Sequence, residues 1–162
     1  MVHICEAGKE NFDQLVECQL KVLMSFSLSL PKEFIEEKRK RHLENDGFCP
    51  EALQNKGHLS LVACEDDMVV GFALGKIDIG GTSWLTFLGV IPSFRKMGYG
   101  EALLKEFINK SKLREARKLS LFTAVELKPA LSLYIKNGFT TDGVARYRNY
   151  GVDLLRYEKN LV

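Results

Sequence analysis

Basic side chains and two glycines follow directly on an apolar run in the middle of the chain. The run, residues 85–91, is long enough for one buried strand. The proline that follows it cannot donate a backbone hydrogen bond to a sheet, so the strand is expected to end there. The motif Arg95-x-x-Gly98-x-Gly100 comes next, and a helical pattern begins after it. Glycines let a backbone approach a ligand closely, and the N–H groups of a first helical turn attract anions. With Lys96 adding a second cation, the stretch predicts a phosphate- or pyrophosphate-binding loop.

The spacing excludes two better-known phosphate loops. A Walker loop needs a Lys-Ser/Thr pair that is absent here, and a dinucleotide fingerprint would need its third glycine where Leu103 stands. The remaining alternative is a glycine-containing turn that only joins a strand to a helix.

Read together with the preceding strand, the loop resembles the GNAT superfamily of N-acetyltransferases. The signature of that family is a strand ending in hydrophobic-x-Val, a nearby proline, and Arg/Gln-x-x-Gly-x-Gly/Ala opening a helix. Leu88-Gly89-Val90, Pro92 and residues 95–100 reproduce it.

A second block of the family follows at the expected distance. It runs from Ala130 to Phe139 and matches A-x-x-L-Y-x-K-x-G-F. Two blocks in the right order are more specific than either one. By element order, the resemblance covers residues 59–162, and it is vague before them.

The resemblance implies acetyl-CoA as the co-substrate, with its pantetheine arm between the strand that ends at Val90 and a strand over residues 119–125. A bulge in the earlier strand frees backbone groups for that arm in the family, and Gly89 would permit one here. The N–H of Val90 would polarise the thioester carbonyl, and the amides of residues 96–101 would hold the diphosphate. The cofactor-binding residues expected are Leu88, Gly89, Val90, Arg95, Lys96, Met97, Gly98, Tyr99, Gly100 and Glu101.

The resemblance also supplies a general acid. Tyr134 matches the phenol that protonates the leaving thiolate in the family. The alternative is a core tyrosine whose hydroxyl bonds locally.

The general base has no such match. Some family members carry a glutamate where Phe122 stands, and many carry an asparagine at the position of Leu127. Glu126 is the only close carboxylate, so it is the candidate for the general base, and a water relay or an already neutral amine stays open. No nucleophile is evident, which favours direct attack in a ternary complex.

Composition places the chain among ordinary globular proteins. Its 162 residues predict one domain over 1–162, with 46% hydrophobic and 27% charged residues. With a formal charge of +2, the protein lacks the strong overall positive charge that is typical of nucleic-acid-binding proteins. No apolar run is long enough for a membrane helix. A cytoplasmic location is the expectation.

The cysteines and histidines do not predict a metal site. Cys5, Cys18, Cys49 and Cys64 form no C-x-x-C pair, and none of the 3 histidines lies at metal-ligand spacing. Free thiols in a reducing compartment are expected.

Periodicity predicts an α/β fold of mixed α+β character, with a central sheet, mixed but mostly antiparallel, of about seven strands flanked by about four helices. The resemblance implies that this is a GNAT-like fold. The charge cluster at residues 36–41 is typical of a solvated helix face, and a surface for an acidic partner is the alternative. Strands are expected over residues 2–6, 59–65, 69–79, 83–90, 119–125, 144–148 and 153–158, and helices from residue 11, from residue 31 toward 43, after residue 100 and over 127–137.

The resemblance implies an N-acetyltransferase that moves acetyl from acetyl-CoA to a primary amine. The acceptor is a small molecule or a peptide, with a weak lean to a protein N-terminus because residues 147–155 loosely resemble ribosomal-protein and N-terminal acetyltransferases. A catalytically impaired acyl-CoA sensor, a polyamine or small-molecule acetyltransferase, and an enzyme using another acyl donor are the alternatives. A homodimer is left open.

Overall fold

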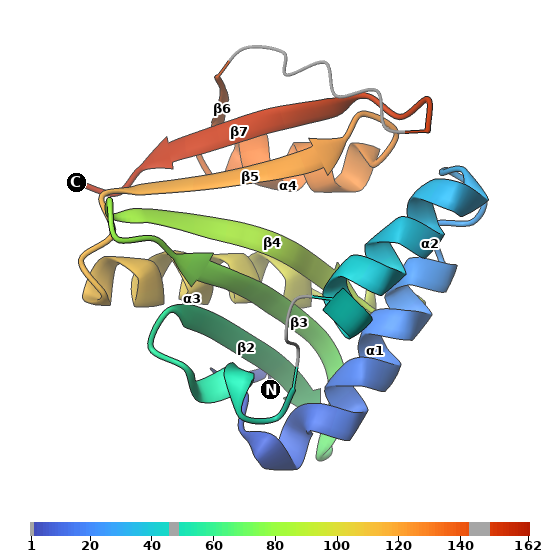
Figure 1. The fold of residues 1–162 in the computed structure, drawn as a ribbon, viewed down its shortest axis with the longest axis horizontal. Coiled ribbons are helices and arrows are strands. Elements are labelled where there is room, and N and C mark those ends of the chain that lie inside the picture. The colour runs from blue at the N-terminus through green and yellow to red at the C-terminus, as the bar shows by residue number, and fades with distance from the viewer. Residues whose placement is uncertain (1, 46–48, 143–149) are drawn as a thin grey trace.

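We describe the fold from a computed structural model, which covers residues 2–45, 49–142 and 150–162. One seven-stranded sheet, in the order β1-β2-β3-β4-β5-β7-β6, forms the centre of the molecule (Figure 1). All neighbouring strands are antiparallel except β4 and β5, which are parallel. The predicted mixed, mostly antiparallel sheet is therefore confirmed.

The strands follow the predicted apolar runs with small changes at their ends. β3 stops earlier than predicted because the turn before Gly81, which has φ +80°, begins at Asp78. The strands are β1 His3–Glu6, β2 His58–Glu65, β3 Met68–Ile77, β4 Thr82–Val90, β5 Lys118–Ala124, β6 Thr140–Thr141 and β7 Leu154–Asn160.

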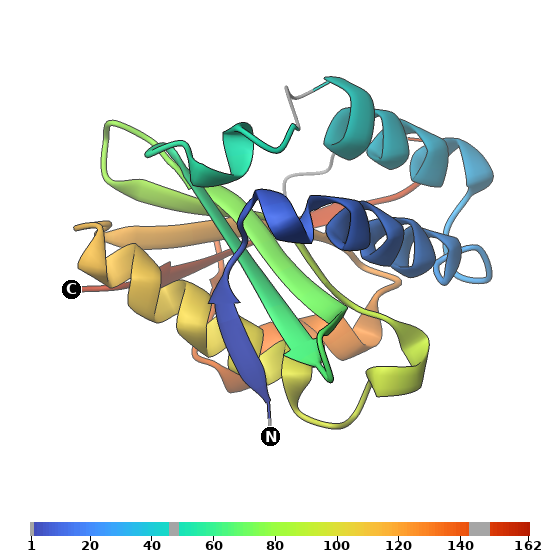
Figure 2. The same ribbon diagram turned by 90° about the horizontal axis from the view of Figure 1, so that it is seen from below.

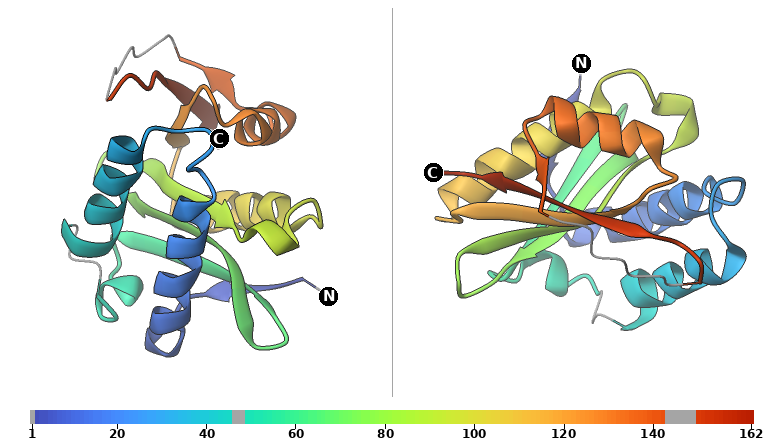
Figure 3. Two further views of the ribbon diagram at one scale, coloured as in Figure 1. Left: turned by 90° about the vertical axis from the view of Figure 1, so that its right-hand side faces the viewer. Right: turned by 90° about the horizontal axis from the view of Figure 1, so that it is seen from above.

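Four α-helices cover the two faces of this sheet. α1 (Phe12–Met24) and α2 (Lys32–Lys40) lie on one face, while α3 (Tyr99–Leu113) and α4 (Lys128–Lys136) lie on the other (Figures 2 and 3). α3 has buried residues at helical spacing, Leu103, Leu104, Phe107 and Ile108, as its sequence predicts.

The parallel strands β4 and β5 are hydrogen-bonded only over the first half of β4. They are paired from Thr82 to Leu85 on β4, and β4 then continues to Val90 without a partner on that side (Figure 1). The connection between them runs through α3, as predicted for a crossover between parallel strands.

The β4 bulge lies at a different residue from the predicted one. Leu74 of β3 pairs with Phe87 and the next residue, Gly75, pairs with Leu85, so Thr86 is the extra residue. Gly89 is paired regularly with Phe72. The expectation of a bulge at Gly89 is wrong, because the glycine serves packing instead.

Replacing Gly89 with alanine is expected to destabilise the protein by about 1–3 kcal/mol, the usual cost of overpacking a core. A Cβ at this position would come within 2.8 Å of both the Phe72 ring and the Val22 side chain on α1. Chemical denaturation of Gly89→Ala measures the change, with Gly57→Ala as the matched control because a Cβ there meets nothing within 4 Å. Equal stability of the two variants would contradict this packing role.

Two further sequence expectations concern the loop before β2 and a strand over residues 144–148. The predicted loop before β2 contains a short 3₁₀ turn, Ala52–Gln54. The predicted strand over 144–148 lies outside the described residues, and β7 pairs with β5 on one side and with β6 on the other. No helix in the described ranges is long and apolar enough to cross a membrane. In those ranges, no group of three or more His, Cys, Asp or Glu residues could hold a metal ion.

Candidate active site

The predicted anion-binding loop leaves β4 and enters α3 through two left-handed residues. A 3₁₀ turn over Pro92–Phe94 comes first, then Lys96 has φ +62° and Gly98 has φ +92°. Gly98 occupies the N-cap of α3, where a side chain would be strained at this φ. The chain reversal thus presents the start of α3 to the side on which β4 and β5 have separated.

The amides of this loop are available to a ligand. In the described part of the chain, the N–H groups of residues 96–101 have no hydrogen-bond acceptor, and the first helical bond at this end runs from Ala102 to the Gly98 carbonyl. Unpaired N–H groups at a helix N-terminus fit an anionic group such as a diphosphate. Lys96 and Met97 are exposed beside them.

Arg95 has a different position from the one expected beside the phosphate. Its Nε donates to the Val90 carbonyl at 2.8 Å, and its guanidinium donates to the Ser25 hydroxyl, at the end of α1, at 2.6 Å. Partial burial lowers its pKa. Arg95 therefore fixes the loop to β4 and α1, while the amides face outward.

The backbone of β4 offers further free donors. The N–H of Ile91 donates to β3 at 3.0 Å. Because hydrogen-bonded pairs alternate along an antiparallel ladder, Leu88 and Val90 direct their N–H groups to the opposite side. β5 is no longer paired there. The Val90 N–H is thus free to donate to a carbonyl lying between the two strands.

Two predicted cofactor residues turn their side chains away from the loop. The ring of Tyr99 is buried, and its hydroxyl donates to Glu65, which raises the pKa of the phenol to about 12. Glu101 accepts bonds from Lys136 on α4 and Lys105 on α3, both at 2.9 Å, which lower its pKa to about 2. The two lysines offset the one negative charge at the start of α3, and the backbone amides of Tyr99 and Glu101 stay available.

Helix α4 brings Tyr134 to the same region. Leu133 of α4 lies against the start of α3, because a Cβ on Gly100 would be 3.8 Å from it. The Tyr134 ring is 6% exposed and lies 5.7 Å from the Phe139 ring and 6.2 Å from the Tyr157 ring. Burial raises the pKa of its phenol. Tyr134 belongs to the hydrophobic core, and its hydroxyl has no hydrogen-bond partner among the described residues.

Glu126, the candidate for the general base, does not point into the protein interior. It is exposed in the turn between β5 and α4, where its carbonyl accepts from the Lys128 N–H at 2.9 Å. Phe122 is 43% exposed and stacks on Trp84 with ring centroids 6.0 Å apart. No carboxylate occupies the middle of β5 in this chain.

Sequence reasoning missed a cluster on α2 and the π-helical turn Arg41–Asn45 that follows it, where the charged residues suggested a solvated face or a surface for an acidic partner. Lys38 is half-buried, with its Nζ 6.0 Å from the Phe34 ring and 5.5 Å from the ring of Phe87 on β4. The imidazole of His42 lies 4.9 Å from the same Phe87 ring. The signal was present in the sequence: Lys38 and His42 follow Phe34 at successive steps of four residues, on the apolar face.

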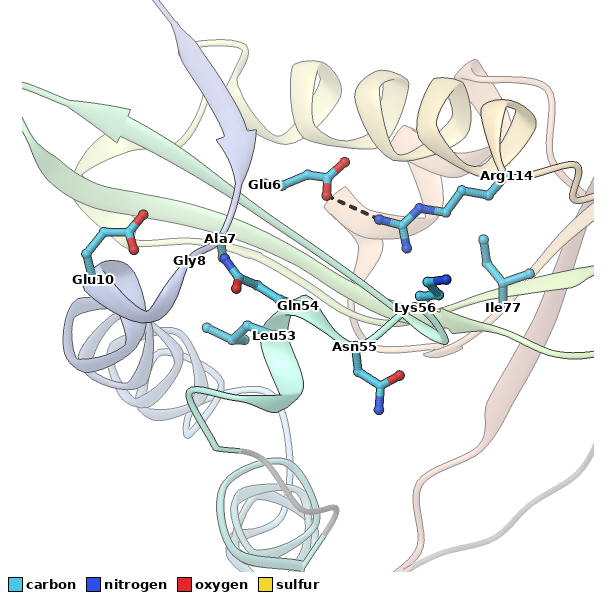
Figure 4. A pocket seen from close by; sticks show the side chains of 10 residues that line it. All are labelled: Glu6, Ala7, Gly8, Glu10, Leu53, Gln54, Asn55, Lys56, Ile77 and Arg114. Atoms are coloured by element: carbon cyan, nitrogen blue, oxygen red, sulfur yellow. Dashed lines mark hydrogen bonds and ion pairs between the residues drawn. The ribbon is translucent and has the colours of Figure 1, made fainter.

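A separate cleft lies near the other end of α3. In Figure 4 it is bounded by the end of β1, by residues 53–56 and by Arg114, which donates to Glu6 at 3.2 Å. None of the predicted site residues lines it.

Comparison with known proteins agrees with this geometry. The acetyltransferase (GNAT) family model matches residues 23–139. A Bacillus subtilis (strain 168) protein, provisionally named a ribosomal protein bS18-alanine N-acetyltransferase, is 30% identical over 68% of this chain and 74% of its own length.

Solved structures share the fold over nearly the whole chain. The PaiA N-acetyltransferase of Thermoplasma acidophilum, in complex with coenzyme A, has a TM-score of 0.82 at 21% identity over 99% of both chains. The ribosomal-protein-S18-alanine N-acetyltransferase of Escherichia coli has a TM-score of 0.75 at 17% identity, covering 99% of this chain and 94% of its own. The chain therefore belongs to the acetyltransferase (GNAT) family, as an acetyl-CoA-dependent N-acetyltransferase.

Proposed function

We propose that residues 1–162 form one domain that transfers the acetyl group of acetyl-CoA to a primary amine by direct attack. The observation that carries this proposal is the opening between β4 and β5. The Val90 N–H and the free amides of the 96–101 loop come from β4 and the loop that follows it, and Tyr134 comes from α4, the helix that follows β5. When bound, acetyl-CoA supplies the activated acetyl group.

Each group of the chain has one task in this proposal. The loop amides hold the diphosphate, and the Val90 N–H donates to the thioester oxygen as negative charge develops on it. Tyr134 donates its proton to the departing sulfur. Arg95 holds the loop against β4 through the Val90 carbonyl.

The acceptor we propose is the α-amine of a peptide. The support comes from the relatives named for action on the alanine of a ribosomal protein, one of them 30% identical to this chain. An α-amine also titrates near pH ~7.7–8.0, so it loses its proton far more readily at physiological pH than a lysine side chain, which titrates near ~10.4.

An amine panel tests the proposed function. The protein is mixed with acetyl-CoA and with an alanine-starting peptide, and release of the free thiol is measured. The matched control is the same peptide with a blocked N-terminus and one internal lysine; spermidine and an aminoglycoside complete the panel. We expect the free α-amine peptide to give the fastest release. Faster release with spermidine would overturn the peptide assignment, and tight coenzyme A binding without any release would favour a sensor.

A further inference from the structure

Helix α2 crosses the opening between the two separated strands, on the face opposite α3 (Figures 1 and 3). Phe34, only 4% exposed, belongs to one packed cluster with Ala124 of β5, whereas Phe87 belongs to β4. The Nζ of Lys38 lies 6.0 Å from the first ring and 5.5 Å from the second. The amine therefore lies against the part of β4 that has no β5 partner, on the sheet face that α2 covers, and one of the two rings that it contacts packs with β5.

Lys38 has no counter-ion in the described part of the chain, although two cations near it in the sequence, Arg39 and Arg41, are paired. Arg39 bonds Glu36 and Glu44, each at 2.7 Å, and Arg41 bonds Glu37 at 2.9 Å. Aromatic faces offset only part of the cost of burying an ammonium. Burial and the nearby charge of Arg41 lower the pKa of Lys38 to about 8, so its neutral amine is accessible near physiological pH.

We infer that Lys38 is the general base of this site and removes a proton from the acceptor ammonium. This inference rests on the proposed function. An N–H bond of the ammonium breaks, and its proton moves to the Nζ lone pair. The nitrogen lone pair then forms the amide bond as the carbon–sulfur bond breaks. The second proton leaves the nitrogen to solvent, and the sulfur takes a proton from Tyr134.

Other groups facing this place are poorer bases. Burial, Lys38 and Arg41 lower the pKa of His42 to about 3, so its imidazole accepts a proton too weakly. The guanidinium of Arg41 stays protonated. Within the described ranges, no carboxylate of α2, β4 or β5 forms an ion pair with Lys38.

Two substitutions separate proton transfer from simple positive charge. Lys38→Arg keeps the charge but cannot act as a base, while Lys38→Met keeps much of the apolar stem. With acetyl-CoA and the alanine-starting peptide, we expect both variants to lose about 10²–10⁴-fold in kcat. Calorimetry should give unchanged coenzyme A affinity. Lys40→Arg and Lys40→Met, on the exposed side of α2, are the matched controls and should keep full kcat.

The outcomes decide the assignment. Full kcat in Lys38→Arg with loss in Lys38→Met would overturn the base and point to binding of an acceptor anion. Partial restoration of kcat in Lys38→Ala by added trimethylamine, which accepts a proton but forms no stable amide, would support Lys38 as the general base. Absence of turnover by the wild-type protein with every amine would instead overturn the proposed function, and the inference with it.

The pH dependence of the wild-type protein tests the same inference without a substitution. Because the base works when deprotonated, kcat should rise as the pH passes through the Lys38 pKa of about 8. The midpoint of this rise should be the same for acceptor amines of different basicity. A flat profile through that pH, or a limb that follows the acceptor amine, would overturn the assignment.

Discussion

Replacing Tyr134 with phenylalanine is expected to lower kcat by about 10²-fold, the lower end of the usual range for general acid catalysis. The low end applies because a coenzyme A thiolate is a fairly good leaving group. Phenylalanine keeps the ring that contacts Phe139 and Tyr157, so packing should survive. The hydroxyl has no partner among the described residues, so its removal leaves no described group unpaired. Steady-state kinetics on folded protein measures the change.

The pH profile gives an independent check on the role of Tyr134. A phenol donates only while it is protonated, and burial raises the pKa of Tyr134 above its ordinary value of ~10. Activity that depends on this proton should therefore persist as the pH rises and fall only above pH ~10. The Tyr134→Phe variant should lack this falling limb.

The matched control for this prediction is Tyr157→Phe. Tyr157 is a similarly buried tyrosine on β7, at 4% exposure, and its ring lies beside that of Tyr134. It should keep full kcat. If Tyr134→Phe also kept full kcat and an unaltered pH profile, water would be the proton donor and Tyr134 would have no part in the mechanism.

Replacing Gly98 with valine is expected to weaken coenzyme A binding by about 10- to 100-fold. A β-branched residue is strained at φ +92°, at a cost of about 1–3 kcal/mol, and relaxing that strain turns the loop amides away from the ligand. Nothing lies within 4 Å of the added Cβ, so packing around the residue is not the cause. Isothermal titration calorimetry with coenzyme A measures the loss. Arg95→Ala should weaken binding less, because its contacts in the structure go to Val90 and Ser25.

Gly81→Val separates loop geometry from general strain. Gly81 has φ +80° in the β3–β4 turn, far from the loop in sequence, and its Cβ would meet nothing closer than 4.0 Å. It should lose stability and keep its coenzyme A affinity. Unchanged affinity in Gly98→Val, with the fold intact, would contradict the placement of the diphosphate at this loop.

Local patterns were sufficient to predict the strand, loop and helix around Gly98. A proline after an apolar run ends a strand, and the change to helical spacing after Gly100 marks α3, because both signals act through neighbouring residues. The αL residue after α4, Gly138 at φ +81°, was predictable for the same reason.

Features set by distant parts of the chain were not predictable. The bulge at Thr86 depends on the register with β3, and Gly89 is a glycine because Val22 of α1 crosses above it. Arg95 is one of two adjacent cations in the sequence, and only the packing of α1 against the loop gives it Ser25 as a partner. Lys38 belongs to a run of charges, and the strand that it faces begins more than forty residues later.

The most direct test of the account follows the acetyl group itself. Acetyl-CoA carrying an isotope label in the acetyl group is incubated with the protein and the alanine-starting peptide for a single turnover, and peptide and protein are examined by mass spectrometry. We predict that the label is found on the peptide α-nitrogen and not on the protein, as direct attack requires. Label found only as free acetate, or retained on the protein, would contradict the account.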